Sequence, residues 1–129
     1  MSAELTALGL AALLQATQIM LAGAVMNRDV GAKWNASARD TQPEFSPLTG
    51  RLRRAVNNHF EGLVLFTIAV VLVTMSDATN VWTVFFSWLY LLARILYIPA
   101  YAFGLSPWRS LIWGVGFFST VAMILIALL

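Results

Sequence analysis

The sequence contains no cysteine and only one histidine. The absence of cysteine excludes disulfide bonds, cysteine nucleophiles and cysteine-based metal sites. A single histidine cannot form a histidine-rich metal site, so no metal-binding residues are predicted.

Charged side chains are also scarce, at 11% of the 129 residues, whereas hydrophobic side chains make up 60%. Soluble domains are about one-quarter charged and about half apolar. The composition therefore predicts an integral membrane protein in contact with membrane lipid. The formal net charge is only +2, and its pattern gives no indication of a nucleic-acid partner. The length fits a single domain, residues 1–129.

Four apolar stretches are long enough to cross a bilayer, which takes about 20 helical residues. The predicted helices cover residues 4–27, 47–75, 81–103 and 107–129. A signal peptide is the alternative for the first stretch, but no basic segment precedes it and its apolar run is too long. Short polar turns join the later helices, so neighbouring helices should be antiparallel. The predicted fold is an all-α bundle of four transmembrane helices.

The hydrophilic segment 28–46 is predicted to be a cytoplasmic loop. Six of the eight Lys and Arg residues lie between the first two spans, and Arg109 lies at the third connection, on the same side. Cytoplasmic loops of membrane proteins are enriched in Lys and Arg, so both termini are predicted on the opposite side. Ser46 and Pro47 are predicted as the N-cap and the first residue of the second helix.

A polar face crosses the start of the second span. Arg54, Asn58 and Glu61 are spaced i, i+4 and i+7, which places them on one side of a helix. Glu61 is followed by an uncharged run from Gly62 to Ser76. A carboxylate inside the membrane boundary is unfavourable unless it has a partner or lines a wet site. This face is therefore predicted to point at protein or at a ligand.

A second polar face lies on the third span, where Arg94, Tyr97 and Tyr101 are spaced i, i+3 and i+7. Arg94 and Glu61 lie at similar depths, each about 10 Å from the loop end of its own face. We therefore expect Glu61 and Arg94 to be partners, within one subunit or across an interface. The alternatives are a purely structural ion pair and, for the tyrosines, a place in the interfacial aromatic belt.

Other polar residues receive structural interpretations. Gln15, Thr17 and Gln18, in the middle of the first span, are predicted to bond neighbouring helices. His59 is rotated off the polar face of the second span and is interpreted as a residue of the membrane boundary.

Three arginines, Arg54, Arg94 and Arg109, are predicted to gather near the cytoplasmic ends of the later spans, with Ser110 beside them. Guanidinium groups bind carboxylates in a forked geometry. The start of the fourth span adds free backbone N–H groups and the positive end of a helix dipole. The residues alone thus predict a site for a small anionic ligand at the membrane boundary.

Three pieces of sequence, in order, resemble one family. RAVNNHFE (54–61) resembles the family's R-x-x-x-N-x-x-E signature. ARILYIPAY (93–101) resembles its helix-three motif, in which an arginine is followed by residues with polar rings one and two turns later. SPWRS (106–110) resembles the P-x-R-S sequence that begins its fourth helix. Together they resemble the superfamily of membrane-associated proteins in eicosanoid and glutathione metabolism. The resemblance covers nearly the whole chain and is greatest for the short bacterial branch.

The resemblance implies a homotrimer in the bacterial inner membrane that holds glutathione as co-substrate between neighbouring subunits. It implies glutathione-binding roles for Arg54, Asn58, Glu61, Arg94, Tyr97 and Tyr101. It implies that Arg109 and Ser110 lie beside the sulfur as catalytic residues. The implied chemistry is attack by an arginine-stabilised thiolate on a small lipophilic electrophile, or reduction of a lipid hydroperoxide.

The chain also departs from the other branches of this family. Val56 stands where several members of the family have histidine. Asn57, Tyr97 and Trp113 stand where the prostaglandin synthase branch has arginine, histidine and tyrosine, although tyrosine occurs at the Tyr97 position in other branches. At these positions the chain has fewer cationic and hydroxyl side chains than those family members, which implies weaker glutathione binding or a different ligand. Two hypotheses therefore stay open: a glutathione-dependent enzyme, and a non-catalytic trimeric scaffold or lipid- or anion-binding protein.

Overall fold

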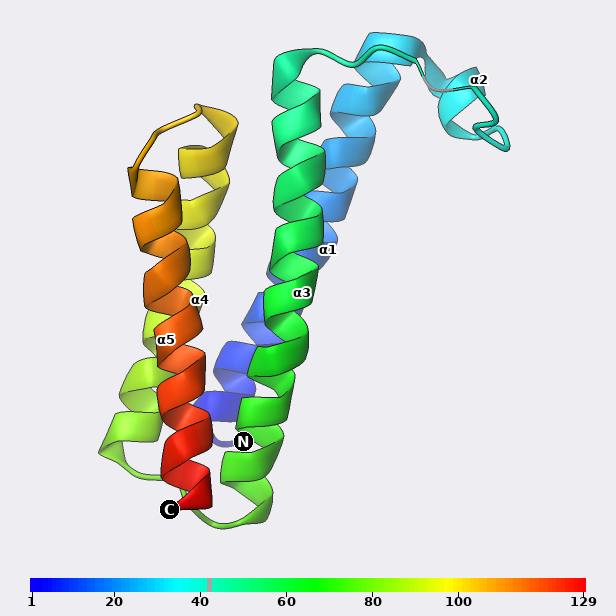
Figure 1. Ribbon diagram of the computed structural model, residues 1–129. Coiled ribbons are helices and arrows are strands. Elements are labelled where there is room, and N and C mark those ends of the chain that lie inside the picture. The colour runs from blue at the N-terminus through cyan, green and yellow to red at the C-terminus, as the bar shows by residue number, and fades with distance from the viewer. Residues whose placement is uncertain (42) are drawn as a thin grey trace.

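The computed structural model describes residues 1–41 and 43–129, and its regular structure is helical (Figure 1). The helices are α1 (Ala3–Val30), α2 (Ala32–Asn35), α3 (Pro47–Met75), α4 (Val81–Ala102) and α5 (Trp108–Leu128). All except α2 are long and apolar enough to cross a membrane. The fold is therefore an all-α bundle with four membrane-length helices.

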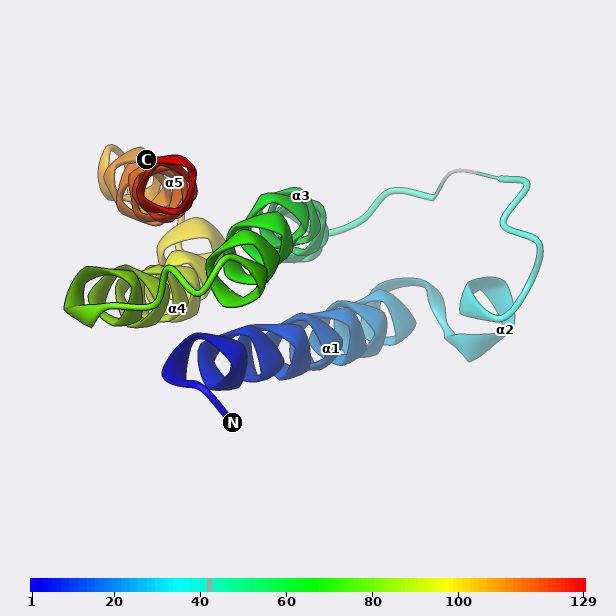
Figure 2. The same cartoon turned by 90° about the horizontal axis from the view of Figure 1, so that it is seen from below.

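Two pairs of helices build the bundle. α1 lies along α3, and α4 lies along α5 (Figures 1 and 2). The pairs meet because α3 contacts both α4 and α5, and because α1 also contacts α4. Both chain termini lie at one end of the bundle, whereas α2 and the connection between α4 and α5 lie at the other end (Figure 1). The predicted site residues near that connection can therefore meet the start of α3.

The starts of α3 and α4 follow local sequence signals. The Ser46 hydroxyl oxygen accepts a hydrogen bond from the backbone N–H of Thr49 at 3.3 Å, and Pro47 is the first helical residue. This is the predicted N-cap. At α4, Asn80 and Thr83 form a capping box. These caps fix where α3 and α4 begin.

The segment 28–46, predicted to be a loop, contains the last turn of α1 and all of α2. α1 therefore runs past its predicted end at residue 27. It ends at Gly31, which has a φ of 87°, a conformation that glycine adopts without strain. The Asp29 carboxylate accepts the backbone N–H of Ser46 at 2.9 Å. This bond ties the end of α1 to the start of α3.

Large apolar side chains cover the outer faces of the bundle. Met75, Trp82 and Phe118 are 82%, 60% and 68% exposed. So much exposed apolar surface is unfavourable in water and is typical of a surface in contact with hydrocarbon. Together with the lengths of the four long helices, it makes this an integral membrane protein that contacts lipid.

The apolar core lies in the half of the bundle nearer the termini. Its fully buried members include Ala7 and Ala11 of α1, Phe66 and Val70 of α3, and Met123 of α5. The alanines let α1 pack closely against its neighbours, as small residues do in membrane helices. The other half of the bundle holds most of the polar side chains described below.

Polar groups join α1 to α3. The Gln15 side-chain amide donates to the Val56 carbonyl oxygen at 3.3 Å, and Gln18 Oε1 lies 2.6 Å from His59 Nδ1. The predicted bonds to a neighbouring helix are confirmed for both glutamines, whereas Thr17 bonds within its own helix. The interpretation of His59 as a boundary residue is wrong, because its side chain is fully buried. A buried imidazole is retained here because Gln18 supplies a partner.

Candidate functional site

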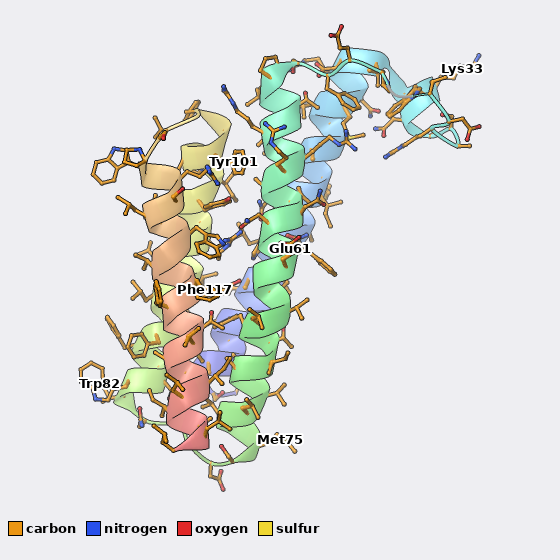
Figure 3. All side chains as sticks on the ribbon, in the orientation of Figure 1. Lys33, Glu61, Met75, Trp82, Tyr101 and Phe117 are labelled. Carbon is orange, nitrogen blue, oxygen red and sulfur yellow. The ribbon has the colours of Figure 1, made fainter. Side chains whose placement is uncertain are left out.

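The polar faces of α3 and α4 meet near the α2 end of the bundle. Arg54 Nε donates a hydrogen bond to the Tyr101 hydroxyl at 3.0 Å. Figure 3 shows Tyr101 near the end of α4, on the side of α3. The two residues are far apart in sequence, and both were predicted site residues. The tyrosine therefore faces a partner on another helix, as a site residue would.

Arg109, in the first turn of α5, completes this junction. Its guanidinium carbon lies 5.0 Å from the centroid of the Tyr101 ring, within the range of a cation–π contact. Its Nη1 lies 3.5 Å from the Tyr97 hydroxyl, at the long end of hydrogen bonding. Tyr97 is fully buried. The two tyrosines thus link Arg109 to the polar faces of α3 and α4.

Arg94 forms the inner end of the same network. Its Nη1 donates a hydrogen bond to Asn58 Oδ1 at 3.1 Å, and its guanidinium carbon lies 4.4 Å from the centroid of the Tyr97 ring. Only 3% of the Arg94 side chain is exposed. A continuous series of contacts therefore runs Arg54, Tyr101, Arg109, Tyr97, Arg94, Asn58.

Glu61 does not pair with Arg94 within the subunit. Over residues 1–41 and 43–129, the one ion pair within 4.0 Å joins Arg28 and Asp29. Asn58 takes the hydrogen bond of Arg94 instead, and Glu61 is exposed on α3 (Figure 3). The predicted pairing is therefore wrong for one subunit. Glu61 and Arg94 nevertheless line the same cavity of about 180 Å³.

Ser110 lies apart from this network. Its side chain is exposed and lines a wide groove of about 960 Å³ between α4 and α5. The rest of the groove is mostly apolar and includes Phe86, Leu89 and Trp113. Arg109, its neighbour in sequence, is half-buried and points to the tyrosines instead. At the start of α5, the Arg109 cation therefore faces the tyrosines on one side of the helix. The Ser110 hydroxyl lies on the other side, beside the apolar groove.

The network is rich in hydrogen-bond donors and positive charge. Its three guanidinium groups contact an amide and two phenolic rings, and no carboxylate of the described residues lies within ion-pair distance of them. The same part of the chain contains no group of three His, Asp or Glu side chains that could hold a metal ion. Such a site can bind a polar anion, and the adjacent groove can hold an apolar group.

The chain matches the family model of the MAPEG family over residues 7–129. The protein belongs to the MAPEG family. Its members commonly use glutathione, so membership associates this membrane protein with glutathione-related transferases and related proteins. The matched region contains the whole arginine and tyrosine network of this MAPEG protein. No curated protein and no solved structure matches the chain.

Sequence reasoning missed Tyr90, which lines the same cavity as Glu61 and Arg94. Its side chain is only 2% exposed. Tyr90 precedes Arg94 by four residues, so it continues the polar face of α4 by one further turn. That spacing could have identified it. Its position deep in an apolar stretch instead favoured a packing role.

Proposed function

We propose that this MAPEG protein is a membrane-bound glutathione-dependent transferase or peroxidase that acts on lipophilic electrophiles. The observation that carries the proposal is the contact of Tyr101 with both Arg54 and Arg109. It brings the start of α5, where the resemblance implies the sulfur site, next to the polar faces of α3 and α4. These faces supply donors for a peptide that carries carboxylates.

The geometry of the network supports the proposed binding roles. Arg54 and Asn58 lie one helical turn apart on α3 and hold the polar groups of the peptide. Tyr97 and Tyr101 contact it from α4. Arg94 and Glu61 bind at the inner end, where they line one cavity. In this account the glutathione lies along the junction of α3 and α4, with its sulfur toward α5.

Arg109 supplies the catalytic charge. A free thiol has a pKa of about 8.5, so it is mostly protonated at neutral pH. A guanidinium beside the sulfur favours the thiolate, which is the nucleophile. In transfer, the thiolate sulfur forms a bond to the electrophilic carbon, and the leaving group departs with the electron pair. In peroxide reduction, the thiolate sulfur attacks one oxygen of the hydroperoxide, the O–O bond breaks, and the alkoxide leaves and is protonated to the alcohol. A second glutathione then attacks the sulfur of the resulting sulfenic acid, which forms the disulfide and releases the transferred oxygen as water.

Ser110 and the groove between α4 and α5 provide the second half of the site. The groove is lined mostly by apolar residues of helices that contact lipid, so a lipophilic substrate can enter it from the bilayer. The Ser110 hydroxyl lies on its wall, one residue from Arg109. A reacting group at this end of the groove would meet a thiolate held by Arg109.

The active form is proposed to be a homotrimer in a bacterial inner membrane, with the segment 28–46 in the cytoplasm and both termini on the opposite side. Two features support assembly. Glu61 is exposed directly before an uncharged run, at a depth where a carboxylate needs a partner. The long helices also carry many large exposed apolar side chains, some of which a second subunit would cover. In the proposed assembly, a cation of a neighbouring subunit pairs with Glu61.

The alternative is a non-catalytic scaffold or a lipid- or anion-binding protein. The network itself would then serve only to join α3, α4 and α5, since its members satisfy one another. In that case Arg109 would matter for stability and not for chemistry. The two functions therefore differ in what removal of the Arg109 guanidinium should do.

The test uses purified protein in detergent or lipid, supplied with glutathione and a lipophilic electrophile or hydroperoxide. Arg109→Ala is expected to reduce product formation at least about 100-fold, the loss typical for removal of a group that stabilises developing charge. Lys33→Ala is the matched control, because Lys33 is an exposed cation of α2 that projects away from the bundle (Figure 3). Equal activity in both variants, or none in the unmodified protein over a broad set of substrates, would favour the alternative.

A further inference from the structure

A second cavity lies between α1, α3 and the segment that contains α2. It has a volume of about 290 Å³, and none of its lining residues belongs to the arginine and tyrosine network. It lies at the α2 end of the bundle, where α2 and the chain that follows it extend from the ends of α1 and α3 (Figure 2). Its lining residues fall into two groups, one cationic or polar and the other apolar.

Two arginines, Arg39 and Arg53, line the polar part of this cavity, and an aromatic ring lies against each. The guanidinium carbon of Arg39 lies 5.4 Å from the centroid of the Trp34 ring, and that of Arg53 lies 4.7 Å from the centroid of the Phe45 ring. The two rings meet edge to face, with centroids 5.6 Å apart. The four side chains therefore form one row with a cation at each end, held by cation–π contacts.

Hydrogen bonds fix the Arg39 end of this row to α1. The side-chain amide of Asn35 donates to the side-chain oxygen of Asn27 at 2.6 Å and to the carbonyl oxygen of Gly23 at 3.3 Å. Arg39 Nε donates in turn to the Asn35 carbonyl oxygen at 3.0 Å, and Arg39 Nη2 donates to the Asn35 side-chain oxygen. Arg39 is therefore positioned by α1 and α2, although it belongs to neither helix.

No carboxylate of the described residues neutralises the two arginines. Asp40 and Glu44 are the acidic residues between α2 and α3, but neither lies within 4.0 Å of the guanidinium nitrogens of Arg39 or Arg53. The remaining polar residues of the lining are asparagines, which carry no charge. The cavity therefore presents uncompensated positive charge beside amide groups, and this combination suits a phosphate oxyanion.

The rest of the lining is apolar and leads away from the α2 end. Ile19, Ala22, Gly23 and Met26 of α1 and Val56 of α3 form it. Ile19 lies about 10 Å along α1 from Met26, toward the middle of the helix. Met26 is 5% exposed, whereas Ile19 is 55% exposed on a helix that is long enough to cross a membrane. The cavity therefore has a cationic end near the edge of the bundle and an apolar end beside the hydrocarbon of the bilayer.

We propose that this cavity binds the headgroup of an anionic phospholipid, with the phosphate between Arg39 and Arg53 and the acyl chains along α1 past Ile19. Basic pockets between membrane helices at the bilayer surface bind such headgroups. About 290 Å³ holds a headgroup, and the acyl chains stay in the bilayer. A zwitterionic headgroup binds less well, because its ammonium group would lie beside two guanidinium groups. This site does not rest on the glutathione function proposed above.

The test compares full-length variants in detergent. Arg53→Gln removes one cation of the cavity, and Lys33→Gln is its matched control, because Lys33 is an exposed cation of α2 outside the lining. Gly23→Leu fills the cavity and keeps every charge, since a Cβ at Gly23 would meet no atom within 4 Å. Gly9→Leu is its control, because Gly9 has the same free space on the same helix but does not line the cavity.

The thermal midpoint of each protein is measured during titration with dioleoyl phosphatidylglycerol. Dioleoyl phosphatidylcholine is the zwitterionic comparison with the same acyl chains. Sodium phosphate tests a free anion, and sodium sulfate at equal ionic strength is its control. A ligand that binds only the folded protein raises the midpoint, so each titration reports an apparent affinity. Light scattering gives the oligomeric mass of every variant.

Phosphatidylglycerol should raise the midpoint of the unmodified protein more than phosphatidylcholine does, and phosphate should act like sulfate. Arg53→Gln should weaken the apparent affinity for phosphatidylglycerol at least about 5-fold, as loss of one basic residue near an anionic lipid surface predicts. Gly23→Leu should remove the preference for phosphatidylglycerol. Lys33→Gln and Gly9→Leu should both keep it.

The proposal is overturned if the two lipids act alike, or if Lys33→Gln loses the preference as fully as Arg53→Gln does. It is also overturned if Gly23→Leu keeps the preference, because the lipid would then lie outside the cavity. A response to phosphate as large as that to phosphatidylglycerol would make the occupant a free anion. An altered oligomeric mass of Gly23→Leu, with no lipid preference in the unmodified protein, would assign the cavity to a contact between subunits instead.

Discussion

Arg94 donates its hydrogen bond to Asn58, at 3.1 Å, and not to Glu61. The buried Arg94 cation therefore has the neutral amide of Asn58 as its partner, and the carboxylate of Glu61, one turn further along α3, is exposed. A buried cation with only an amide partner is unfavourable in a closed bundle, but it is suited to a site that awaits an anion.

Asn58→Ala should destabilise the protein. It would remove the partner of Arg94 Nη1 and leave a third donor of a buried guanidinium unpaired. The expected loss is about 1–3 kcal/mol in the free energy of unfolding. Thermal unfolding in detergent at fixed lipid content would measure it. Asn57→Ala is the matched control, because Asn57 is exposed on the same helix; an equal loss in both variants would contradict the assigned role of Asn58.

Tyr101→Phe should weaken glutathione binding more than it weakens the fold. The change removes the hydroxyl that accepts the Arg54 hydrogen bond at 3.0 Å, but it keeps the ring beneath Arg109. Loss of one hydrogen bond to a charged group predicts a loss of about 1.5–3 kcal/mol in binding. Isothermal titration with glutathione would measure this. Unchanged affinity would mean that Arg54 does not need Tyr101 to hold the ligand.

Gly62→Ala should disturb the cavity, because the added Cβ would lie 3.3 Å from the Tyr90 hydroxyl oxygen. Crowding of this kind costs about 1–3 kcal/mol where the neighbour cannot move, and the Tyr90 ring is stacked on Phe66. Combination with Tyr90→Phe should recover part of the loss, because it removes the crowded atom. Thermal unfolding of the single and double variants would measure the recovery.

Gly114→Ala is the matched control for this crowding, since a Cβ at Gly114 meets no atom within 4 Å. It should leave stability unchanged or raise it slightly, because alanine favours a helix over glycine by about 1 kcal/mol. If Gly62→Ala behaves in the same way, the close approach of Tyr90 to α3 is not a constraint on the bundle.

Glu4→Ala should loosen the end of the bundle that holds the termini. The Glu4 side chain is 1% exposed, and its Oε1 accepts a hydrogen bond from the Thr83 hydroxyl at 2.7 Å. Thr83 also belongs to the capping box of α4, so this bond ties the start of α1 to the start of α4. The expected loss is about 1–3 kcal/mol, measured by thermal unfolding. Glu4→Gln keeps an acceptor oxygen and should lose less; an equal loss would contradict the bond.

The sequence predicts the helices and the polar faces because both depend on local periodicity. The spacings of Arg54 with Asn58 and of Arg94 with Tyr97 place each pair on one helix face, and the two faces do meet. The spacing of residues within one helix does not determine which donor bonds to which acceptor on a neighbouring helix. The predicted pair Glu61 and Arg94 was therefore wrong for one subunit, although the two residues line one cavity.

The same limit explains the misjudged residues. His59 lies off the polar face of α3, on the side that packs against α1. Only this packing shows that Gln18 of α1 is its hydrogen-bond partner. Tyr90 was missed because a tyrosine in an apolar stretch has the pattern of a packing residue, and its unused hydroxyl is visible only in three dimensions. Contacts between subunits lie beyond the pattern of one chain, so the homotrimer stays a prediction.

The central claim is that Arg109 stabilises the thiolate of bound glutathione. The most direct measurement is an ultraviolet difference titration of glutathione bound to the purified protein across neutral pH, with Arg109→Ala and Lys33→Ala in parallel. The account predicts a saturable thiolate absorbance at pH values well below the free thiol pKa of about 8.5, lost in Arg109→Ala and kept in Lys33→Ala. Saturable binding with no thiolate signal, or an equal signal in Arg109→Ala, would contradict it.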